Sequence, residues 1–241
     1  MLRDLLVFAA ITLFTTPAFA GPYFVEVIGG YNTYDMSTVN EFLDSVNEDS
    51  GTSAFEHLDS GGSFGVALGW IQNQRMATSV AYERLSATEE SSSPEVVMKI
   101  KAPANVIRFQ LAYAVAKLGP VIPFVQGGAG FIWNNGYLEY QDEFGNDIRH
   151  DFSGSTITFE GLVGAEVRLS DRFGLNLAGG YRFADISDVK WDASSFGGYG
   201  TFSGPGFDYS GAMVRVGLRI GLNWDLGESS EDDSEDPTGW M

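Results

Sequence analysis

The sequence predicts an all-β protein, an antiparallel up-and-down transmembrane β-barrel of about eight strands with a short helix in its first extracellular loop. The clearest evidence is residues 210–224, where the even positions from Ala212 to Trp224 are apolar and the odd positions include Arg215 and Arg219. Successive side chains of a strand point to opposite faces, so this segment has one apolar and one polar face. Seven other segments repeat the pattern, and short and long links alternate between them.

The seven other segments follow in chain order. They are residues 23–34, 64–72, 76–87, 105–115, 121–133, 156–169 and 173–183. Their apolar faces are Tyr23, Val25, Val27 and Tyr31; Phe64, Val66, Leu68 and Trp70; Val80 and Tyr82; Ile107, Phe109, Leu111, Tyr113 and Val115; Val125, Ala129, Phe131 and Trp133; Ile157, Phe159, Val163, Val167 and Leu169; and Phe173, Leu175, Leu177, Tyr181 and Phe183. Each segment is near the roughly 9–11 residues that a tilted strand needs to cross a membrane.

The links give an independent signal. The short links are residues 71–75, 117–120 and 170–172, and the long polar links are residues 35–61, 88–97, 134–154 and 186–209. Outer-membrane barrels have short periplasmic turns and long external loops. With the N-terminus on the periplasmic side, every short link is expected in the periplasm and every long link outside.

Composition limits the function. The 241 residues carry a formal charge of −18, which argues against nucleic acid as a partner because its binders need a basic surface. No cysteine is present, so neither a lipid-anchored N-terminus nor a disulfide framework is expected. The length suits one closed sheet and is too small for two sizeable domains.

The two ends differ from the middle of the chain. Residues 1–20 have the pattern of a cleaved signal peptide, with Arg3, an apolar run over 5–14 and a small-residue site at Ala18-Phe19-Ala20. This predicts export to the cell outer membrane, with a barrel over 21–226. Residues 227–241 are acidic and are expected to form a disordered tail.

The faces separate a membrane barrel from a soluble lipocalin-like barrel. The apolar face is too large to fill a small barrel, and Trp70, Trp133 and Trp224 lie near strand ends, as membrane girdles do. Charges on the opposite face are tolerable only in a lumen. These charged residues are Glu26, Glu83, Arg108, Glu160, Glu166, Arg168, Arg182, Arg215 and Arg219.

The near balance of inward acids and arginines predicts a lumen packed with ion pairs, since a barrel of about eight strands has room only for side chains. From strand order and height we expect Glu160 to approach Arg182, and Glu26 to approach Arg219. The alternative interpretation, that these charges are only solvated, stays open.

With these features the chain resembles the small outer-membrane β-barrel family typified by the OmpA transmembrane domain and OmpX. The resemblance covers residues 21 to about 226. Arg215, Gly217, Ile220 and Leu222 are similar to the family's assembly signal, which implies recognition by the barrel assembly machinery. The acidic tail departs from the family's aromatic C-terminus, and no periplasmic domain follows, so an anchoring role is not implied.

A search for catalytic chemistry finds little. The two histidines, His57 and His150, fall in expected external loops. Strict alternation puts His150 and Ser153 on opposite faces, and no spacing matches the family's enzymes. The loop acids Asp142, Glu143 and Asp147 match no calcium loop. We therefore expect no catalytic residue, metal or cofactor.

The glycine-rich run 127–130 lies within a strand, where small residues give room to side chains across the lumen.

Two loop features remain. Thr38 to Glu41 is a capping-box pattern followed by Val39, Phe42, Leu43 and Val46 at helical spacing, which predicts a short helix that caps the barrel mouth, lies on the lipid headgroups or simply packs on the surface. A basic cluster lies near the outer end of a hairpin and consists of Arg84, Lys99 and Lys101; phosphates of lipopolysaccharide would meet these side chains there.

We expect a monomeric barrel with a structural or surface-interaction role; the alternatives are a narrow channel for small solutes and a lipid-modifying enzyme.

Overall fold

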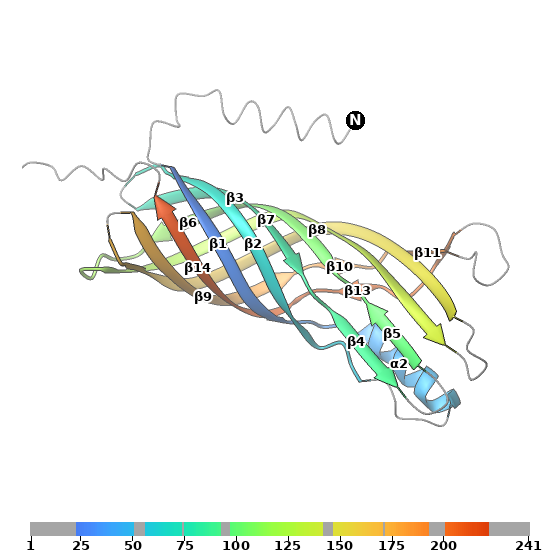
Figure 1. The fold of residues 1–241 in the computed structure, drawn as a ribbon. Coiled ribbons are helices and arrows are strands. Elements are labelled where there is room, and N and C mark those ends of the chain that lie inside the picture. The colour runs from blue at the N-terminus through green and yellow to red at the C-terminus, as the bar shows by residue number, and fades with distance from the viewer. Residues whose placement is uncertain are drawn as a thin grey trace, which may run out of the picture.

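The computed structural model describes residues 23–50, 56–73, 75–92, 97–141, 147–170, 172–192 and 201–221. Eight long antiparallel strands close into a barrel (Figure 1). They are β1 (Tyr23–Thr33), β2 (Ser60–Ile71), β3 (Met76–Leu85), β6 (Ala104–Ala114), β7 (Val121–Gln141), β8 (Asp147–Arg168), β9 (Phe173–Phe183) and β14 (Gly211–Gly221). Neighbours along the chain pair with each other, and β1 pairs with β14 to close the barrel. The predicted fold class is confirmed.

Several expectations fall outside the described residues. These are the signal peptide 1–20, Asp142 and Glu143, the last two residues named in the terminal strand (Leu222 and Trp224), and the acidic tail 227–241.

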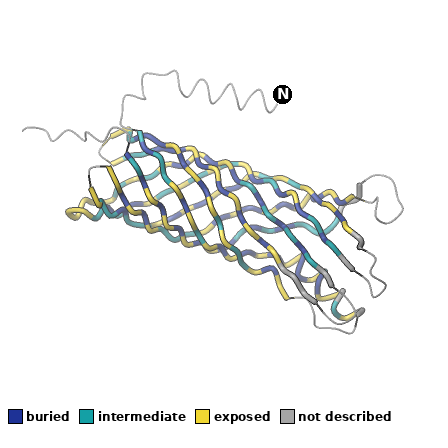
Figure 2. Tube along the Cα trace, in the orientation of Figure 1, coloured by how far each residue is buried: buried dark blue, intermediate teal, exposed yellow. Residues whose placement is uncertain are grey.

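Burial alternates along every long strand, as Figure 2 shows. The exposed positions in the middle of the strands are apolar, for example Val66, Phe109, Val163 and Val216, which are 42% to 64% exposed. In water this surface would be very unfavourable, whereas in a bilayer it contacts lipid. The apolar band therefore marks the membrane-facing surface.

The aromatic girdle differs in detail from the expectation. Trp133 is half-buried and stacks on Phe131, with ring centroids 6.1 Å apart. Trp70 is only 6% exposed, because it packs against its neighbours, including Phe109 at 6.4 Å. Trp70 therefore contributes to packing between neighbouring strands more than to the surface.

The short links are tight turns with side-chain or glycine support. Asn73 Oδ1 accepts hydrogen bonds from the backbone N–H groups of Arg75 and Met76, both at 2.9 Å. Gly119 has a φ of 64°, a conformation that side chains with a Cβ adopt at a cost. Because strands alternate in direction, these turns lie at one end of the barrel.

The opposite end is longer and more ordered than the sequence suggested. Residues 134–154 were expected to form a loop, yet β7 and β8 run 21 and 22 residues and continue well into it. The same alternation of exposed and buried positions continues there, but the chemistry of the two faces is reversed: Asp151 and Ser153 face out, while Phe152 and Leu138 are buried inside. A search for apolar outer faces misses such a segment, because its outer face meets water.

Other long links also contain strands. The link at residues 88–97 contains β4 (Thr88–Ser92) and the first residue of β5 (Val97–Lys101). β4 pairs with β5, and β5 pairs with β7. The last long link contains β10 (Asp185–Ile186), β11 (Lys190–Asp192), β12 (Thr201–Ser203) and β13 (Phe207–Asp208). Of these, β11 extends the sheet beside β8.

The expected helix is present as α2 (Ser37–Ser50). It begins one residue before Thr38, so Thr38 lies in the first turn and is not its N-cap. Its buried residues Val39 and Leu43 join Met36 in an apolar cluster inside the end of the barrel opposite the short turns, which is the external end in the predicted orientation. The helix therefore caps the mouth, which decides among the three placements left open by the sequence. In the described part of the chain, no helix is long and apolar enough to cross a membrane.

Candidate functional site

The inner face of the barrel carries its charged groups in two clusters. Alternation along the strands turns these side chains inward, and the register of neighbouring strands sets their heights. The central cluster contains two acids and three arginines from five strands, all buried: Glu83, Arg108, Glu160, Arg182 and Arg215.

In the central cluster, one oxygen of Glu83 contacts all three arginines. Glu83 Oε2 lies 3.0 Å from Arg182 Nη2 and 2.9 Å from Arg215 Nη2, and it also accepts a hydrogen bond from Arg108 Nη1. Arg215 forms a bidentate salt bridge with Glu160: Nη1 lies 2.9 Å from Oε1, and Nη2 lies 2.7 Å from Oε2. Such paired contacts orient the guanidinium group as well as neutralising it.

The second cluster lies nearer the short turns. Glu26 and Arg219 are opposite each other in the register of β1 and β14, and their ion pair is 3.0 Å long. Arg219 Nη1 also lies 2.5 Å from Glu166 Oε2, and its guanidinium carbon is 4.1 Å from the centre of the Phe24 ring. Arg168 lines a small opening at this end together with Glu166 and Arg219.

Two pairings were expected from strand order. Glu26 and Arg219 are in contact, as described above. Arg182 lies 3.7 Å from Glu160 but 3.0 Å from Glu83, which is therefore its nearer partner. Glu160 was predicted as the partner of Arg182 because their strands are adjacent. The contact with Glu83 could not be predicted in this way, because Glu83 reaches Arg182 across the lumen from β3.

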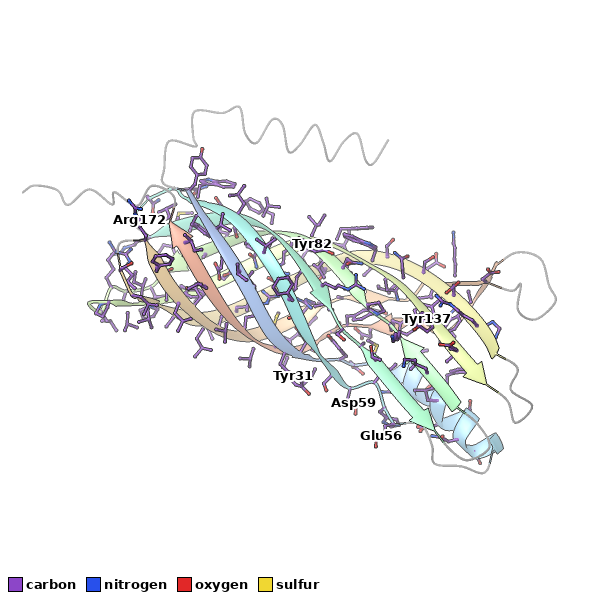
Figure 3. All side chains as sticks on the ribbon, in the orientation of Figure 1. Tyr31, Glu56, Asp59, Tyr82, Tyr137 and Arg172 are labelled. Atoms are coloured by element: carbon purple, nitrogen blue, oxygen red, sulfur yellow. The ribbon has the colours of Figure 1, made fainter. Side chains whose placement is uncertain are left out.

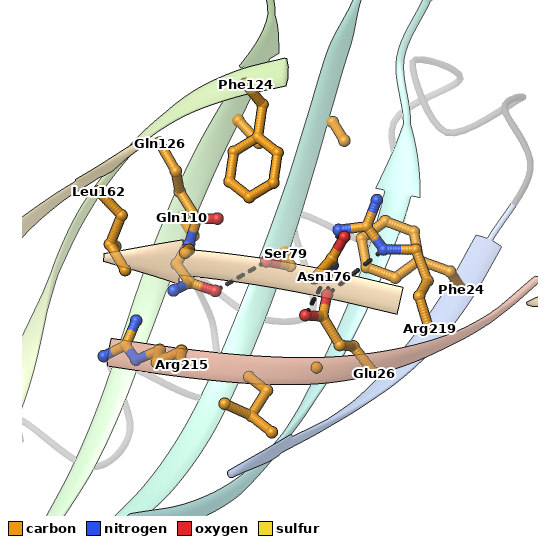
Figure 4. A pocket seen from close by; sticks show the side chains of 15 residues that line it. Phe24, Glu26, Ser79, Gln110, Phe124, Gln126, Leu162, Asn176, Arg215 and Arg219 are labelled. Carbon is orange, nitrogen blue, oxygen red and sulfur yellow. Dashed lines mark hydrogen bonds and ion pairs between the residues drawn. The ribbon is translucent and has the colours of Figure 1, made fainter. Parts of the chain in front are cut away.

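Neutral polar side chains line the space between the clusters, and the ion-pair network predicted from the sequence did not include them. Gln110 accepts from Ser79 Oγ at 3.1 Å and donates to Glu160 Oε1 at 2.8 Å, while Asn176 donates to Glu26 Oε1 at 2.8 Å. They surround a cavity of about 30 Å³ between Arg215 and Arg219 (Figure 4). Their inward phase is the same as that of the charged residues, but the predicted network contained charged residues alone.

Glycines make room for the charges. A Cβ on Gly130 would lie 2.6 Å from Arg108 Cα, and one on Gly217 would lie 2.2 Å from Glu26 Oε1. In the expected assembly signal, Arg215 and Gly217 face the lumen, Ile220 is half-buried, and Leu222 lies outside the described residues. Gly217 thus has a packing role in the folded barrel.

Above the central cluster, the lumen becomes apolar. A continuous buried cluster fills the external end, and its larger members include Tyr34, Leu43, Leu85, Ile132, Phe152, Trp191, Phe207 and Tyr209. Tyr209 donates a hydrogen bond to the carbonyl of Ala102 at 2.6 Å, and burial raises the pKa of Tyr209, which keeps the phenol neutral. Charged and apolar layers therefore follow each other along the axis.

The two histidines lie in different environments. His57 is exposed, and its Nε2 is 3.1 Å from Asp44 Oδ1; this hydrogen bond raises the pKa of His57. His150 was expected in a loop but lies in β8, facing inward and 6% exposed, whereas Ser153 faces outward. Within the described ranges, no group of three or more histidine, cysteine or acidic side chains has the spacing of a metal site.

These features define a membrane-type β-barrel with a filled lumen. A family model described as outer membrane protein beta-barrel domain matches residues 6–218. The chain belongs to this family, and membership implies a location in the outer membrane. No curated protein matches the sequence.

Several solved structures match the chain at low sequence identity. Neisserial surface protein A (NspA) is 17% identical, with 82% of this chain and 96% of that chain covered and a TM-score of 0.42. Ail of Yersinia pestis is 11% identical, with coverages of 83% and 99% and a TM-score of 0.44. OprG of Pseudomonas aeruginosa is 13% identical, with coverages of 85% and 97% and a TM-score of 0.44.

Proposed function

We propose that this protein is a monomeric, non-conducting and non-enzymatic outer-membrane barrel whose external part is a contact surface. The observation that carries the proposal is the sequence of barriers along the lumen. An ion entering from the short-turn end would meet Arg219 with its acids, then the central cluster, then the apolar cluster. A wet path would have to cross all three.

The apolar cluster is the strongest barrier. Its side chains are at most 7% exposed, and α2 covers it from outside. Moving an ion through such a region without hydration is very costly. The central ion pairs add a second barrier, because parting them would leave buried charges uncompensated.

A narrow channel for small solutes is the second candidate. The cavity of about 30 Å³ and an opening of about 60 Å³ lined by Arg168 and Arg219 favour it, because both lie in the half of the lumen nearer the short turns. They support a pocket reaching partway into the barrel. A lipid-modifying enzyme is the least favoured, because the two histidines differ in environment: His57 is exposed and paired with Asp44, whereas His150 is buried in β8.

Other parts of the proposal concern biogenesis. We infer that residues 1–20 are removed after export and that the assembly machinery reads Arg215, Gly217, Ile220 and Leu222 in the last strand. The apolar outer face runs around the whole barrel, which favours a monomer surrounded by lipid.

The test is single-channel conductance of the refolded protein in a planar bilayer. The parent is expected to be silent. Arg215→Ala and Glu26→Ala are also expected to be silent, because the apolar cluster still closes the lumen. Combining Arg215→Ala with Leu43→Asp, which puts a charge into the apolar cluster, is expected to produce a leak.

The control is Arg84→Gln, which removes a charge from the outer face, and circular dichroism establishes that each variant is folded. A steady conductance in the parent whose ion selectivity changes in Glu26→Ala would overturn the proposal in favour of a channel.

A further inference from the structure

A groove on the outer wall of the barrel, separate from the lumen, carries two cations. It has a volume of about 470 Å³ and lies where β2, β3 and the segment between β5 and β6 meet. Phe64, Arg84, Ser86, Lys101 and Pro103 are among its lining residues. Arg84 projects outward because Glu83, next to it, faces the lumen.

The groove lies at the outer boundary of the lipid-facing band. In the register of the sheet, Phe64 pairs with Arg84, Arg84 with Asn105, and Asn105 with Trp133. Phe64 is 67% exposed, which places a large apolar ring at the rim of the groove.

Tyrosine hydroxyls mark the same boundary. Tyr82 donates to Asn105 Oδ1 at 2.8 Å, and Tyr31 donates to Ser60 Oγ at 2.6 Å. Both tyrosines are labelled in Figure 3. Aromatic side chains with an apolar body and a polar tip collect at the level of lipid headgroups. The groove is therefore level with the headgroups of the outer leaflet.

The cations of the groove are not neutralised by the protein where its side chains are described. Neither Arg84 nor Lys101 forms an ion pair with a described carboxylate. Lys101 instead lies 5.7 Å from the centre of the Tyr137 ring. Arg149, which is paired with Asp151 at 2.9 Å, lies 4.0 Å from the centre of the same ring. In a chain with a charge of −18, two cations beside an apolar ring favour an anionic, amphipathic ligand.

We propose that this groove binds a phosphate of an anionic outer-leaflet lipid. Arg84 binds the phosphate oxygens through its planar fork, and Lys101 adds a second positive charge. The acyl chains run from Phe64 along the apolar wall of β2. The inference rests on the outer-membrane location and is independent of whether the lumen conducts.

The test uses the full chain in nanodiscs of neutral phosphatidylcholine that contain a small fraction of bis-phosphorylated lipid A. After extraction in mild detergent and washing, the lipid A retained per protein is measured by mass spectrometry. The parent is expected to retain it. Arg84→Gln and Lys101→Gln are each expected to lower the apparent affinity about tenfold, the loss expected for one charge-assisted hydrogen bond.

Controls separate charge from apolar contact and lipid from free phosphate. Lys117→Gln, in a turn at the other end of the barrel, is expected to bind like the parent. Dephosphorylated lipid A is expected to be lost on washing. Inorganic phosphate at millimolar concentration is expected to compete weakly, because it lacks the acyl chains that contact Phe64.

Three results would overturn the inference. These are equal retention by the parent and the Arg84→Gln, Lys101→Gln double variant, equal retention of dephosphorylated lipid A, and complete displacement by inorganic phosphate. The first two would mean that the cations are not the binding groups, and the third that the site takes free phosphate. None of them would alter the conductance test, so the two proposals fail separately.

Discussion

Glu83 holds three guanidinium groups through one oxygen, in a place with no access to solvent. Its side chain and that of Arg108 are 0% exposed. Buried ion pairs need not add net stability compared with apolar packing, yet removing one partner is strongly destabilising because the others stay buried and charged. Glu83 is therefore the residue on which the central cluster most depends.

We expect Glu83→Gln to lower the free energy of unfolding by about 3–5 kcal/mol, because a neutral amide leaves three arginines with Glu160 alone. Urea unfolding in lipid vesicles measures this. Glu26→Gln is the matched variant and is expected to cost less, since Arg219 keeps Glu166. Equal losses in the two variants would contradict this account of the central cluster.

The glycines under the charges give a second prediction at this scale. Gly130→Ala places a Cβ 2.1 Å from the carbonyl oxygen of Ile107, so the backbone must shift. We expect it to lower the free energy of unfolding by about 1–3 kcal/mol, as overpacking does. Gly127→Ala, on the same strand with nothing within 4 Å of the new Cβ, is the control. If both variants unfold at the same urea midpoint, the backbone accommodates the new Cβ at position 130 without loss of stability, which would contradict the prediction.

At the scale of elements, the helix and its following segment form a cap tied by polar contacts. Asn40 Oδ1 accepts from the backbone of Leu58 at 2.9 Å, and Asn40 Nδ2 donates to Asp59 Oδ1 at 3.1 Å. Asp44 and His57 add a contact that depends on pH. These contacts hold residues 57–59 against α2.

The His57 contact predicts a pH dependence of the cap. The pKa of His57 is raised above about 6.5, the usual value, because Asp44 stabilises the imidazolium. This contribution is fully present below pH about 6.5 and is lost as pH rises through the raised pKa. Nuclear magnetic resonance titration of His57 is expected to show the raised pKa, and Asp44→Asn to return it toward the usual value. An unchanged pKa in Asp44→Asn would mean that another group stabilises His57.

As a whole molecule, the barrel extends beyond its lipid-facing band, because β7 and β8 continue past it. Its central band is apolar outside and charged inside, while its external extension is polar outside and apolar inside. Figure 3 places Glu56, Asp59 and Tyr137 toward one end and Arg172 at the other. The same closed sheet thus meets lipid in one part and water in the next.

Single cysteines test this arrangement, because the chain has none of its own. With a membrane-impermeant maleimide on intact cells, Ser153→Cys on the external extension is expected to react. Lys117→Cys in a short turn is expected to react only after lysis, and Val163→Cys, facing lipid, only in detergent. Labelling of Lys117→Cys on intact cells would reverse the assigned orientation.

The barrel, its lipid-facing band and the charges that face inward could be predicted from the sequence, because alternation with period two is local to each strand and the apolar face is unusually continuous. Three features became apparent only in the folded barrel: the contact of Arg182 with Glu83, the hydrogen bonds of Gln110 and Asn176 to the two clusters, and the apolar cluster that closes the external end. The first two depend on side chains that meet across the lumen. The third depends on an extension whose outer face is polar and whose inner face is apolar. Both are set by the closure of the sheet, which brings together residues far apart in the chain.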